Sequence, residues 1–422
     1  MTEMKNILPP NWSWVKLEDV GEIVAGGTPS TLVNEYFDGE IAWITPADLT
    51  GYSNKYISKG RRNISIIGLK NSSARIVPKG SILFSSRAPI GYVAIASNDI
   101  CTNQGFKILV PNKKVDSEFV YYYLKSAKQL AEKNASGTTF KEISSTNFKQ
   151  LPIPLPPLLE QKKIVKKIEE LFSGLDSGIA SLKKAKEQLR IYRQSVLAHA
   201  FSGKLTEEVK GETKNGELPE GWKWVKLGEL SELITKGASP RWQGFEYVSD
   251  QTQTLFVTSE NVRDNYLDIS KPKYLEDSFN EKQKRSILKK GDVLFNLVGA
   301  SIGRATVFNI DIKSNINQAV AVIRLKDKLK NNYLSYYLNS ESAKKYYMNE
   351  VVDFARANLS LTDTSNIPIP YCPLAQQTQI VEEIESRFAG SEALEKAIDE
   401  SLTKAETLRQ SILKKAFEGK LV

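Results

Sequence analysis

The chain has 422 residues, of which 41% are hydrophobic and 25% charged, so we expect two or three packed domains rather than a disordered chain. Its two cysteines, Cys101 and Cys372, and its one histidine, His199, exclude a disulfide framework and a metal cage of cysteine and histidine. We therefore expect no metal site. The formal net charge of +9 favours a polyanionic partner such as a nucleic acid.

The sequence predicts a soluble, cytoplasmic protein without a membrane partner. No apolar run reaches the roughly 18 to 20 residues that cross a bilayer. Residues 1–14 lack the basic segment followed by an apolar stretch that marks a signal peptide.

Along the chain, five segments occur twice in the same order, so the chain is a tandem duplication. The pairs are 8–24 with 218–234, 77–86 with 288–297, 121–126 with 335–340, 151–161 with 367–377, and 193–205 with 409–421. Each copy therefore contains the same succession of elements, and each must fold in the same way.

The first part of each copy predicts a globular domain of mixed strands and helices, of the α/β (α+β) class. Short runs rich in β-branched and aromatic residues alternate with turn-forming segments, and a helical stretch follows them. In the first copy the runs are 82–86, 92–96 and 106–110 with a helix near 117–133, and in the second they are 292–297, 304–308 and 319–325 with a helix near 330–347. We assign these domains to residues 1–156 and 217–372.

The second part of each copy predicts a long helix with a fixed register, at residues 157–206 and 373–422. The offset between copies grows from 210 at Trp12 and Trp222 to 216 at Pro152 and Pro368, and stays at 216 to the end. Loops tolerate such insertions, but an extra residue in a packed helix would turn every later side chain off its face. The polar segment 207–216 is predicted to link the two copies.

Apolar residues in these two regions recur alternately every three and four positions, which predicts a coiled-coil seam. If unbroken, each helix is roughly 65 Å long at about 1.5 Å per residue, although Gly174 and Gly178 could interrupt the first. Gly203 and Gly419 mark the expected ends. The predicted seam comprises Ile164, Ile168, Leu171, Leu175, Leu182, Leu189 and Val196 in the first helix, and Ile380, Ile384, Leu394, Ile398, Leu408 and Ile412 in the second.

The sequence contains no motif that predicts catalysis. No phosphate-binding loop of the G-x-x-x-x-G-K-[ST] type is present, and the glycines at 297–303 are predicted to form a turn between strands. No Asn/Asp-Pro-Pro-Tyr/Phe segment of the kind shared by amino-methyltransferases occurs. His199 falls on the predicted seam, with Lys415 as its equivalent, and we interpret it as a packing residue. A nuclease site of scattered carboxylates and lysines stays open.

Several segments together resemble the specificity subunit of a type I restriction–modification system, over almost the whole chain. They are WITPADL (43–49), SILFSSRAPIGYVAIA (81–96), CTNQGFKIL (101–109), LPIPLPPLLEQKKIVKKIEELF (151–172) and RQSVLAHAFSGKL (193–205). The second copy departs from the pattern, because VTSENV (257–262) replaces ITPADL and LVGASIG replaces SSRAPIG. This divergence fits recognition of a different half-site.

The resemblance implies a non-catalytic, DNA-binding subunit of a bacterial or archaeal complex, with two target-recognition domains in a pseudo-two-fold, circular arrangement. The helices would pair antiparallel as a spacer and dock methyltransferase subunits, of which we expect two, with two restriction (translocase) subunits joining through them. The chain itself would bind no cofactor, whereas its partner subunits would use S-adenosylmethionine, ATP and Mg. Two alternatives stay open: a self-contained DNA-modifying enzyme and a coiled-coil scaffold outside restriction.

Two unlike readers on a rigid spacer predict an asymmetric, bipartite target in double-stranded DNA with a constant gap, because accessible major-groove faces recur about every 34–36 Å. Residues that read bases should differ between copies, whereas shared residues should be structural or position phosphates. Arginine suits bidentate contact with guanine.

The candidates follow from this comparison. Those that differ are Arg61, Arg62 and Arg87 in the first domain and Arg241, Lys284, Arg285 and Arg304 in the second, with Arg87 and Arg304 ranked first because they border the turn between strands. Those that are shared are the pairs Asn103-Gln104 and Asn317-Gln318, expected to be structural or to position phosphates, and Trp12, Trp14, Trp222 and Trp224, expected in the core.

Overall fold

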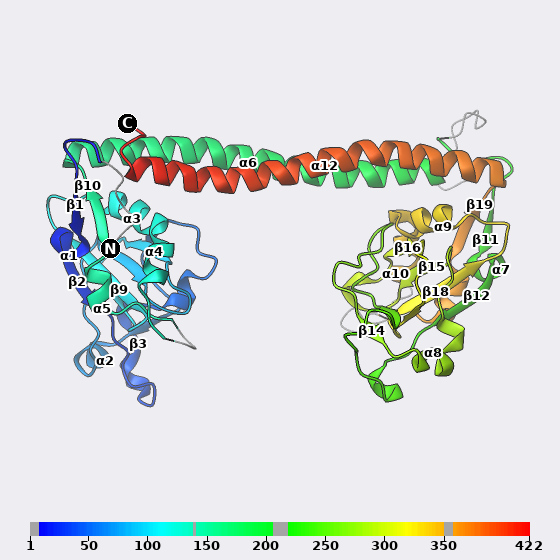
Figure 1. Cartoon of the computed structure of the whole chain (residues 1–422), viewed down its shortest axis with the longest axis horizontal. Helices are drawn as coiled ribbons and strands as arrows, with labels where there is room; N and C mark the ends of the chain where they lie inside the picture. Colours follow the sequence, from blue (N-terminus) through cyan, green and yellow to red (C-terminus); the bar gives the residue numbers. More distant parts are fainter. Residues whose placement is uncertain (1–7, 138–140, 206–217, 350–357) are drawn as a thin grey trace. The chain divides into compact units, whose positions relative to one another are not determined.

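The computed structural model describes residues 8–137, 141–205, 218–349 and 358–422. The chain divides into two compact units, Met1–Leu182 with Asp399–Val422 and Lys183–Ile398. Each unit holds one globular domain and a part of each long helix (Figure 1). The functional division inferred from sequence, into two recognition domains and two helices, stays a prediction. The predicted linker 207–216 lies outside the described residues.

The first globular domain (8–156) is built on a five-stranded sheet of order β2-β9-β6-β7-β4 and a three-stranded sheet of order β5-β3-β8. Its strands are β1 Ser13–Lys16, β2 Gly21–Ala25, β3 Phe37–Ile44, β4 Tyr56–Ile57, β5 Arg62–Ile64, β6 Ile82–Ser85, β7 Val93–Ala96, β8 Cys101–Thr102, β9 Phe106–Pro111 and β10 Pro152–Leu155. Its helices are α1 Leu17–Val20, η1 Asn34–Tyr36, η2 Pro46–Leu49, α2 Ile66–Lys70, α3 Ser117–Ser126, α4 Lys128–Lys133 and α5 Ser145–Lys149.

The second globular domain (218–372) repeats this plan with a four-stranded sheet of order β12-β18-β15-β16 and a three-stranded sheet of order β14-β13-β17. Its strands are β11 Lys223–Lys226, β12 Ser231–Lys236, β13 Thr254–Val257, β14 Tyr274–Leu275, β15 Val293–Asn296, β16 Ala305–Val307, β17 Ser314–Ile316, β18 Val320–Leu325 and β19 Pro368–Tyr371. Its helices are α7 Leu227–Leu230, η3 Arg241–Gln243, α8 Ser278–Lys282, η4 Lys284–Ser286, η5 Gly299–Ser301, α9 Asn331–Leu338, α10 Glu341–Asn349 and α11 Leu361–Asn366. The α/β character predicted from sequence is confirmed in both copies.

The larger sheet of each domain is buried on both faces, which explains why its strands read as continuous apolar runs. In β6, Ile82 and Phe84 point to the core shared with α3 and the long helices, whereas Leu83 points to the core between the two sheets. In β15, Val293 and Leu294 divide in the same way. This alternation follows from the period of two residues along a strand.

Each long helix is one uninterrupted element of 44 residues, α6 Leu158–Phe201 and α12 Leu374–Phe417. A Cβ at Gly174 or Gly178 would meet nothing within 4 Å, so both glycines lie on the open helix surface. A glycine there costs only about 1 kcal/mol relative to alanine, and packing on the opposite face holds the helix together. The predicted ends are confirmed, because Gly203 and Gly419 follow the helices in the left-handed conformation, with φ of 79° and 70°.

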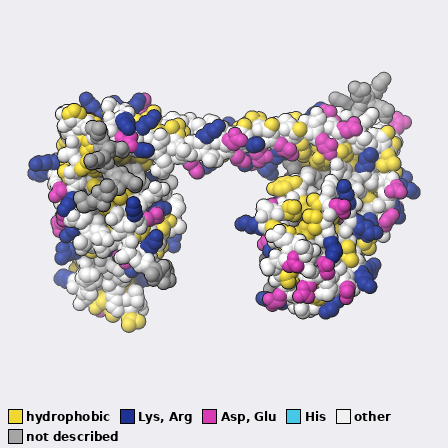
Figure 2. All heavy atoms as spheres, in the orientation of Figure 1, with side chains coloured by type: hydrophobic (Ala, Val, Ile, Leu, Met, Phe, Trp, Pro, Cys, Tyr) yellow, Lys and Arg dark blue, Asp and Glu magenta, His cyan; other side chains and the backbone are white. Residues whose placement is uncertain are grey.

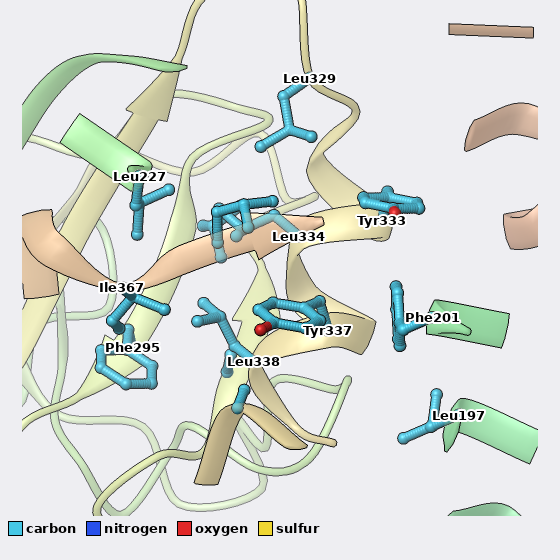
Figure 3. Close-up of a cluster of buried hydrophobic side chains, with 14 of the residues drawn as sticks. Leu197, Phe201, Leu227, Phe295, Leu329, Tyr333, Leu334, Tyr337, Leu338 and Ile367 are labelled. Atoms are coloured by element: carbon cyan, nitrogen blue, oxygen red, sulfur yellow. The ribbon is translucent and has the colours of Figure 1, made fainter. Parts of the chain in front are cut away.

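In each unit the two long helices pack antiparallel, with the start of one against the end of the other. In the first unit, Ile164 and Ile168 of α6 share a core with Ile412 and Phe417 of α12. The second unit has the reciprocal arrangement, in which the end of α6 packs against the start of α12 and against α9. Phe201 lies 5.2 Å and 5.1 Å from the ring centres of Tyr333 and Tyr337 (Figure 3).

The predicted seam is correct at most positions and wrong at two. Leu394 and Leu408 are 52% and 50% exposed, so they lie outside the seam. Their neighbours Glu395 and Arg409 hold the seam positions and form ion pairs with the opposite helix. Ile164, Ile168, Val196, Ile380, Ile384, Ile398 and Ile412 are buried, whereas Leu171, Leu175, Leu182 and Leu189 are half-buried.

Two further expectations need correction. His199 is exposed rather than packed in the seam, and its equivalent Lys415 is exposed as well.

Trp14 and Trp224 are 37% and 51% exposed, because their strands β1 and β11 pair only with β10 and β19 and leave one face open. Their neighbours Trp12 and Trp222 are buried as predicted, and each donates its ring N–H to the first turn of a long helix, at Glu160 and Gln376, over 2.9 Å.

Among the described residues, no helix is both long enough and apolar enough to cross a membrane.

Candidate nucleic-acid interface

The shared pairs Asn103-Gln104 and Asn317-Gln318 form the same turn in each domain. The side-chain oxygen of Asn103 accepts the backbone N–H of Gly105 over 2.9 Å, and that of Asn317 accepts the N–H of Ala319 over 3.1 Å. Each asparagine also donates its own backbone N–H to the strand alongside. The asparagines thus hold the backbone of a turn, in line with the structural role expected of shared residues. Gln104 and Gln318 are both exposed on the surface of these turns.

In the first domain, Arg61 and Arg62 lie at β5 in the three-stranded sheet. The Arg61 side chain is 78% exposed, and its backbone N–H donates to the Asp48 carboxylate over 3.0 Å. The guanidinium of Arg62 lies 4.1 Å from the centre of the Phe37 ring, which fixes its direction while half of it stays exposed. The helix that follows β5, α2, lies at the end of the domain away from α6 (Figure 1).

In the second domain, three candidates lie on short helical turns. Arg241 lies in η3, whereas Lys284 and Arg285 lie in η4 just after α8, and all three are exposed. Lys282 joins the two segments, because its ammonium group donates to the carbonyl of Gln243 over 3.2 Å. The structure therefore unites residues some 40 positions apart in sequence into one basic surface, which we call the α8 surface (Arg241, Lys282, Lys284 and Arg285).

The sequence comparison overlooked Lys282 as a member of this surface. Its ammonium group lies 4.9 Å from the centre of the Phe245 ring, and Phe245 packs on Phe279 with ring centres 5.3 Å apart. The basic residues at 282, 284 and 285 were the available signal, but only the fold shows that this segment meets the η3 loop.

The two top-ranked candidates, Arg87 and Arg304, lie elsewhere, in the turns that join β6 to β7 and β15 to β16. Arg87 Nη1 is 3.6 Å from a carboxylate oxygen of Glu142, which also accepts a hydrogen bond from the buried Lys107 over 3.2 Å. Arg304 is half-buried at the start of β16. Neither residue joins Arg61 and Arg62 or the α8 surface, so the candidates form two separate groups in each domain.

The charge of Arg87 is partly balanced by Glu142 of its own domain. The side chain of Lys107 is only 8% exposed, so the Glu142 carboxylate balances a buried positive charge as well as Arg87. In the second domain the corresponding backbone bridge joins Val298 to Asn358, without ionic groups. The cluster at Arg87 is thus specific to the first domain.

A second ionic cluster, which no sequence pattern predicted, ties the first domain to α6. Lys55 lies between the carboxylates of Glu118 on α3, at 2.7 Å, and Glu169 on α6. Burial opposes the charge on Lys55, but these two hydrogen bonds outweigh it and raise the pKa of Lys55 above its ordinary value. Burial would raise the pKa of Glu118, but the hydrogen bonds from Lys55 and Tyr56 outweigh it and lower that pKa.

Basic side chains are spread over each globular domain on the face drawn in Figure 2, and acidic ones lie among them. Positioned cations scattered over folded surfaces are the arrangement by which proteins grip a duplex through its phosphates.

Comparison with known proteins gives one consistent result. The family described as "Type I restriction modification DNA specificity domain" matches twice, at residues 9–188 and 219–404. A type I restriction enzyme specificity subunit of Methanocaldococcus jannaschii, MjaIX, is 32% identical over 383 residues, which are 88% of this chain and 85% of that protein. The EcoBI specificity subunit of Escherichia coli is also 32% identical, over 75% of this chain and 68% of that protein.

Two solved structures share the fold. A chain from a type I R-M system, solved to explain complex assembly and conformational transition, has a TM-score of 0.75 and 24% identity and covers 98% of this chain and 99% of its own length. The HsdS subunit from Thermoanaerobacter tengcongensis has a TM-score of 0.54 and 23% identity over the whole of both chains.

Proposed function

This chain belongs to the family of type I restriction–modification DNA specificity subunits, and from that premise we propose that it reads an asymmetric, bipartite target in double-stranded DNA. The observation that carries this proposal is that two domains of one fold each present exposed basic side chains, with different residues at different positions. Arg61 and Arg62 lie at β5 in the first domain, and the α8 surface follows β14, the corresponding strand of the second. The same framework with different side chains suits two different half-sites.

The two domains differ where a reader must differ and agree where the framework needs support. The turns at Asn103 and Asn317 have the same hydrogen bonds. Arg62, in contrast, stacks on Phe37 in the first domain, whereas the second presents Arg241, Lys284 and Arg285 on short helical turns. Half or more of all protein–DNA hydrogen bonds go to the backbone, so we assign this group to both phosphate and base contacts.

We propose that α6 and α12 set the gap between the half-sites. Their 44-residue lengths and their seams leave no position for an inserted residue without turning the helix face, in agreement with the constant offset of 216 between the copies.

We further propose that these helices dock two methyltransferase subunits, through which two restriction subunits join. The chain itself would act without catalysis and bind no cofactor, whereas the partners would use S-adenosylmethionine, ATP and Mg. It would act in the cytoplasm, where the DNA of a bacterium or archaeon lies.

Methylome sequencing of cells that express this chain with its methyltransferase partner tests the proposal. We expect one asymmetric motif of two short half-sites with a constant gap. A variant in which both helices are lengthened by one turn, about 5.4 Å each, should keep both half-sites and change the gap. The absence of site-specific methylation with the unaltered complex would contradict the proposal. An unchanged gap in the variant with lengthened helices would contradict the spacer role of α6 and α12.

The purified chain alone, incubated with DNA and S-adenosylmethionine, should transfer no methyl groups, and methylation should begin when the partner is added. Methylation by the chain alone would identify a self-contained enzyme instead.

A further inference from the structure

Among the described residues, the two most exposed large hydrophobic side chains occupy corresponding loops. Leu32 is 94% exposed in the connection between β2 and β3, and Trp242 is 87% exposed in the connection between β12 and β13. A single exposed apolar side chain is common on a protein surface, but these two lie at the same place in two copies of one fold. The coincidence of position in two copies of one fold indicates a shared purpose.

Both loops leave the sheet in the same way. A Cβ on Gly26 would lie 1.9 Å from the carbonyl oxygen of Asn103, and a Cβ on Gly237 would lie 1.9 Å from that of Ile316. Only glycine fits these positions. Each loop therefore starts against the asparagine turn of its own domain. This contact fixes the position of the first residues of the loop relative to the sheet.

The tip in the second domain is preformed rather than loose. The backbone N–H groups of Gln243 and Phe245 both donate to the carbonyl of Pro240, over 2.9 Å and 3.0 Å. Phe245 then packs on Phe279, which belongs to the core around Phe256. A rigid turn thus presents the indole of Trp242 to solvent, and little conformational entropy opposes its burial against a ligand.

The first domain holds its tip in a similar way. The Val33 N–H closes the turn around Leu32 by donating to the carbonyl of Ser30 over 3.3 Å, and the backbone of Ser65, before α2, donates to the carbonyl of Tyr36 over 2.9 Å.

Cations accompany both loops, at the tip in the second domain and at the end of the loop in the first. Arg241 precedes Trp242 in the chain, and Lys282 of the α8 surface bonds the next residue, Gln243. In the first domain Arg62 stacks on Phe37, the residue that follows η1. An apolar tip flanked by cations is complementary to a duplex groove, in which phosphates border the apolar faces of the bases. A protein partner docked on the long helices would not meet these tips, since α2 and α8 lie at the ends of their domains away from those helices (Figure 1).

We propose that Leu32 and Trp242 enter a groove of the DNA and make apolar contact with bases, each in the half-site of its own domain. This inference rests on the proposed function. Phosphates offer nothing to an indole or an isobutyl group, so these contacts add specificity rather than electrostatic affinity. The first tip would contribute to one half-site only, and the second tip to the other.

The test uses the full chain with its methyltransferase partner and compares Leu32→Ala, Trp242→Ala and Trp242→Phe with the unaltered complex. Trp242→Ala should weaken binding to the methylated target sequence about tenfold or more and relax the sequence preference in the second half-site, while the first half-site stays unchanged. Leu32→Ala should do the reverse. Trp242→Phe should restore most of the affinity.

The slope of binding against salt concentration should not change in these variants, because no phosphate contact is lost. Trp224→Ala, which removes another exposed tryptophan of the same domain, is the matched control and should leave the sequence preference unchanged.

Sequence preferences that are unchanged in Leu32→Ala and Trp242→Ala would overturn the inference while the unaltered complex still shows site-specific methylation. A loss of methyltransferase binding in the absence of DNA would also overturn it, because the tips would then be protein contacts. If the unaltered complex itself shows no site specificity, the proposed function fails first.

Discussion

The guanidinium of Arg409, near the end of α12, lies 5.0 Å from the centre of the Phe172 ring on α6. The other copy repeats the relationship 216 positions away, where Arg193 lies 5.9 Å from the ring of Phe388. Each phenylalanine in turn meets a tyrosine of its globular domain edge to face, at 5.8 Å for Tyr122 and 5.7 Å for Tyr336. In both units, an arginine–phenylalanine–tyrosine stack thus joins the helix pair to the domain.

The two arginines pair with different carboxylates, Arg193 with Glu395 and Arg409 with Asp176. The contribution of the first pair to stability can be measured by replacing its two partners. Arg193 donates to Glu395 over 2.7 Å and to the Ser391 hydroxyl over 2.8 Å. Because this pair is part-buried, removal of one partner leaves a charge without its counterion. We expect Glu395→Leu to destabilise the chain by about 1–2 kcal/mol and the double variant Arg193→Met with Glu395→Leu to recover part of it.

Urea unfolding of the four proteins in this cycle gives the coupling energy. If the double variant loses more unfolding free energy than the two single variants together, the ion pair does not stabilise the seam.

The register of the seam gives a second prediction, which separates neighbouring apolar residues. Ile384 is fully buried, so Ile384→Ala should cost about 2–5 kcal/mol in unfolding free energy. Leu394 and Leu408 are half exposed, so Leu394→Gln and Leu408→Gln should each change it by about 0.5 kcal/mol or less. Urea unfolding measures both. Equal losses at all three positions would restore the register predicted from the sequence.

The error at these two leucines shows what periodicity can and cannot decide. A pattern of apolar residues locates a helix face only where the seam is apolar, and here the seam positions hold Glu395 and Arg409. The sequence pattern therefore placed the adjacent leucines, Leu394 and Leu408, in the seam. The duplication, the mixed domains and the uninterrupted helices needed no such detail, because repeats, strand runs and a constant offset are properties of long segments.

The candidate site divides in the same way. The comparison of copies separated Asn103 and Asn317 from the basic residues, since a shared turn leaves identical residues in both copies. It could not group Arg241 with Lys284 and Arg285, because the contact between η3 and α8 passes through Lys282 and depends on tertiary packing. Nor could it show that Arg87 is partly neutralised by Glu142.

The cluster at Lys55 predicts how stability depends on pH. The pKa of Glu118 is lowered in the folded state, so its contribution is present above the ordinary value near 4.5 and is lost as pH falls through the lower folded value. The pKa of Lys55 is raised, so its contribution is complete below the ordinary value of 10.5 and is lost only at more alkaline pH. Glu118→Gln should therefore lower the melting temperature at pH 7 and make little difference at the acid end.

Thermal unfolding of both proteins between pH 3 and 9 measures this difference. Asp38→Asn, at a 78% exposed side chain 3.8 Å from Arg62, is the matched control and should have a much smaller effect at pH 7. A Glu118→Gln deficit that persists undiminished at the lowest pH would show that the loss is steric rather than ionic.

The α8 surface predicts a dependence on salt that distinguishes it from the apolar tips. If Lys284 and Arg285 contact phosphates, each replacement by alanine removes one released counterion, so the slope of log affinity against log salt concentration should fall in magnitude by about 0.9 per contact. Both side chains are exposed, so the fold should tolerate the change. Titration of the partner-bound complex with duplex DNA at several salt concentrations measures the slope. If either residue contacts a base, its replacement should instead relax the preference at one base pair of the target and cost about 1–3 kcal/mol in binding free energy. Arg241→Ala in the same assay tells whether η3 makes a phosphate contact or a base contact.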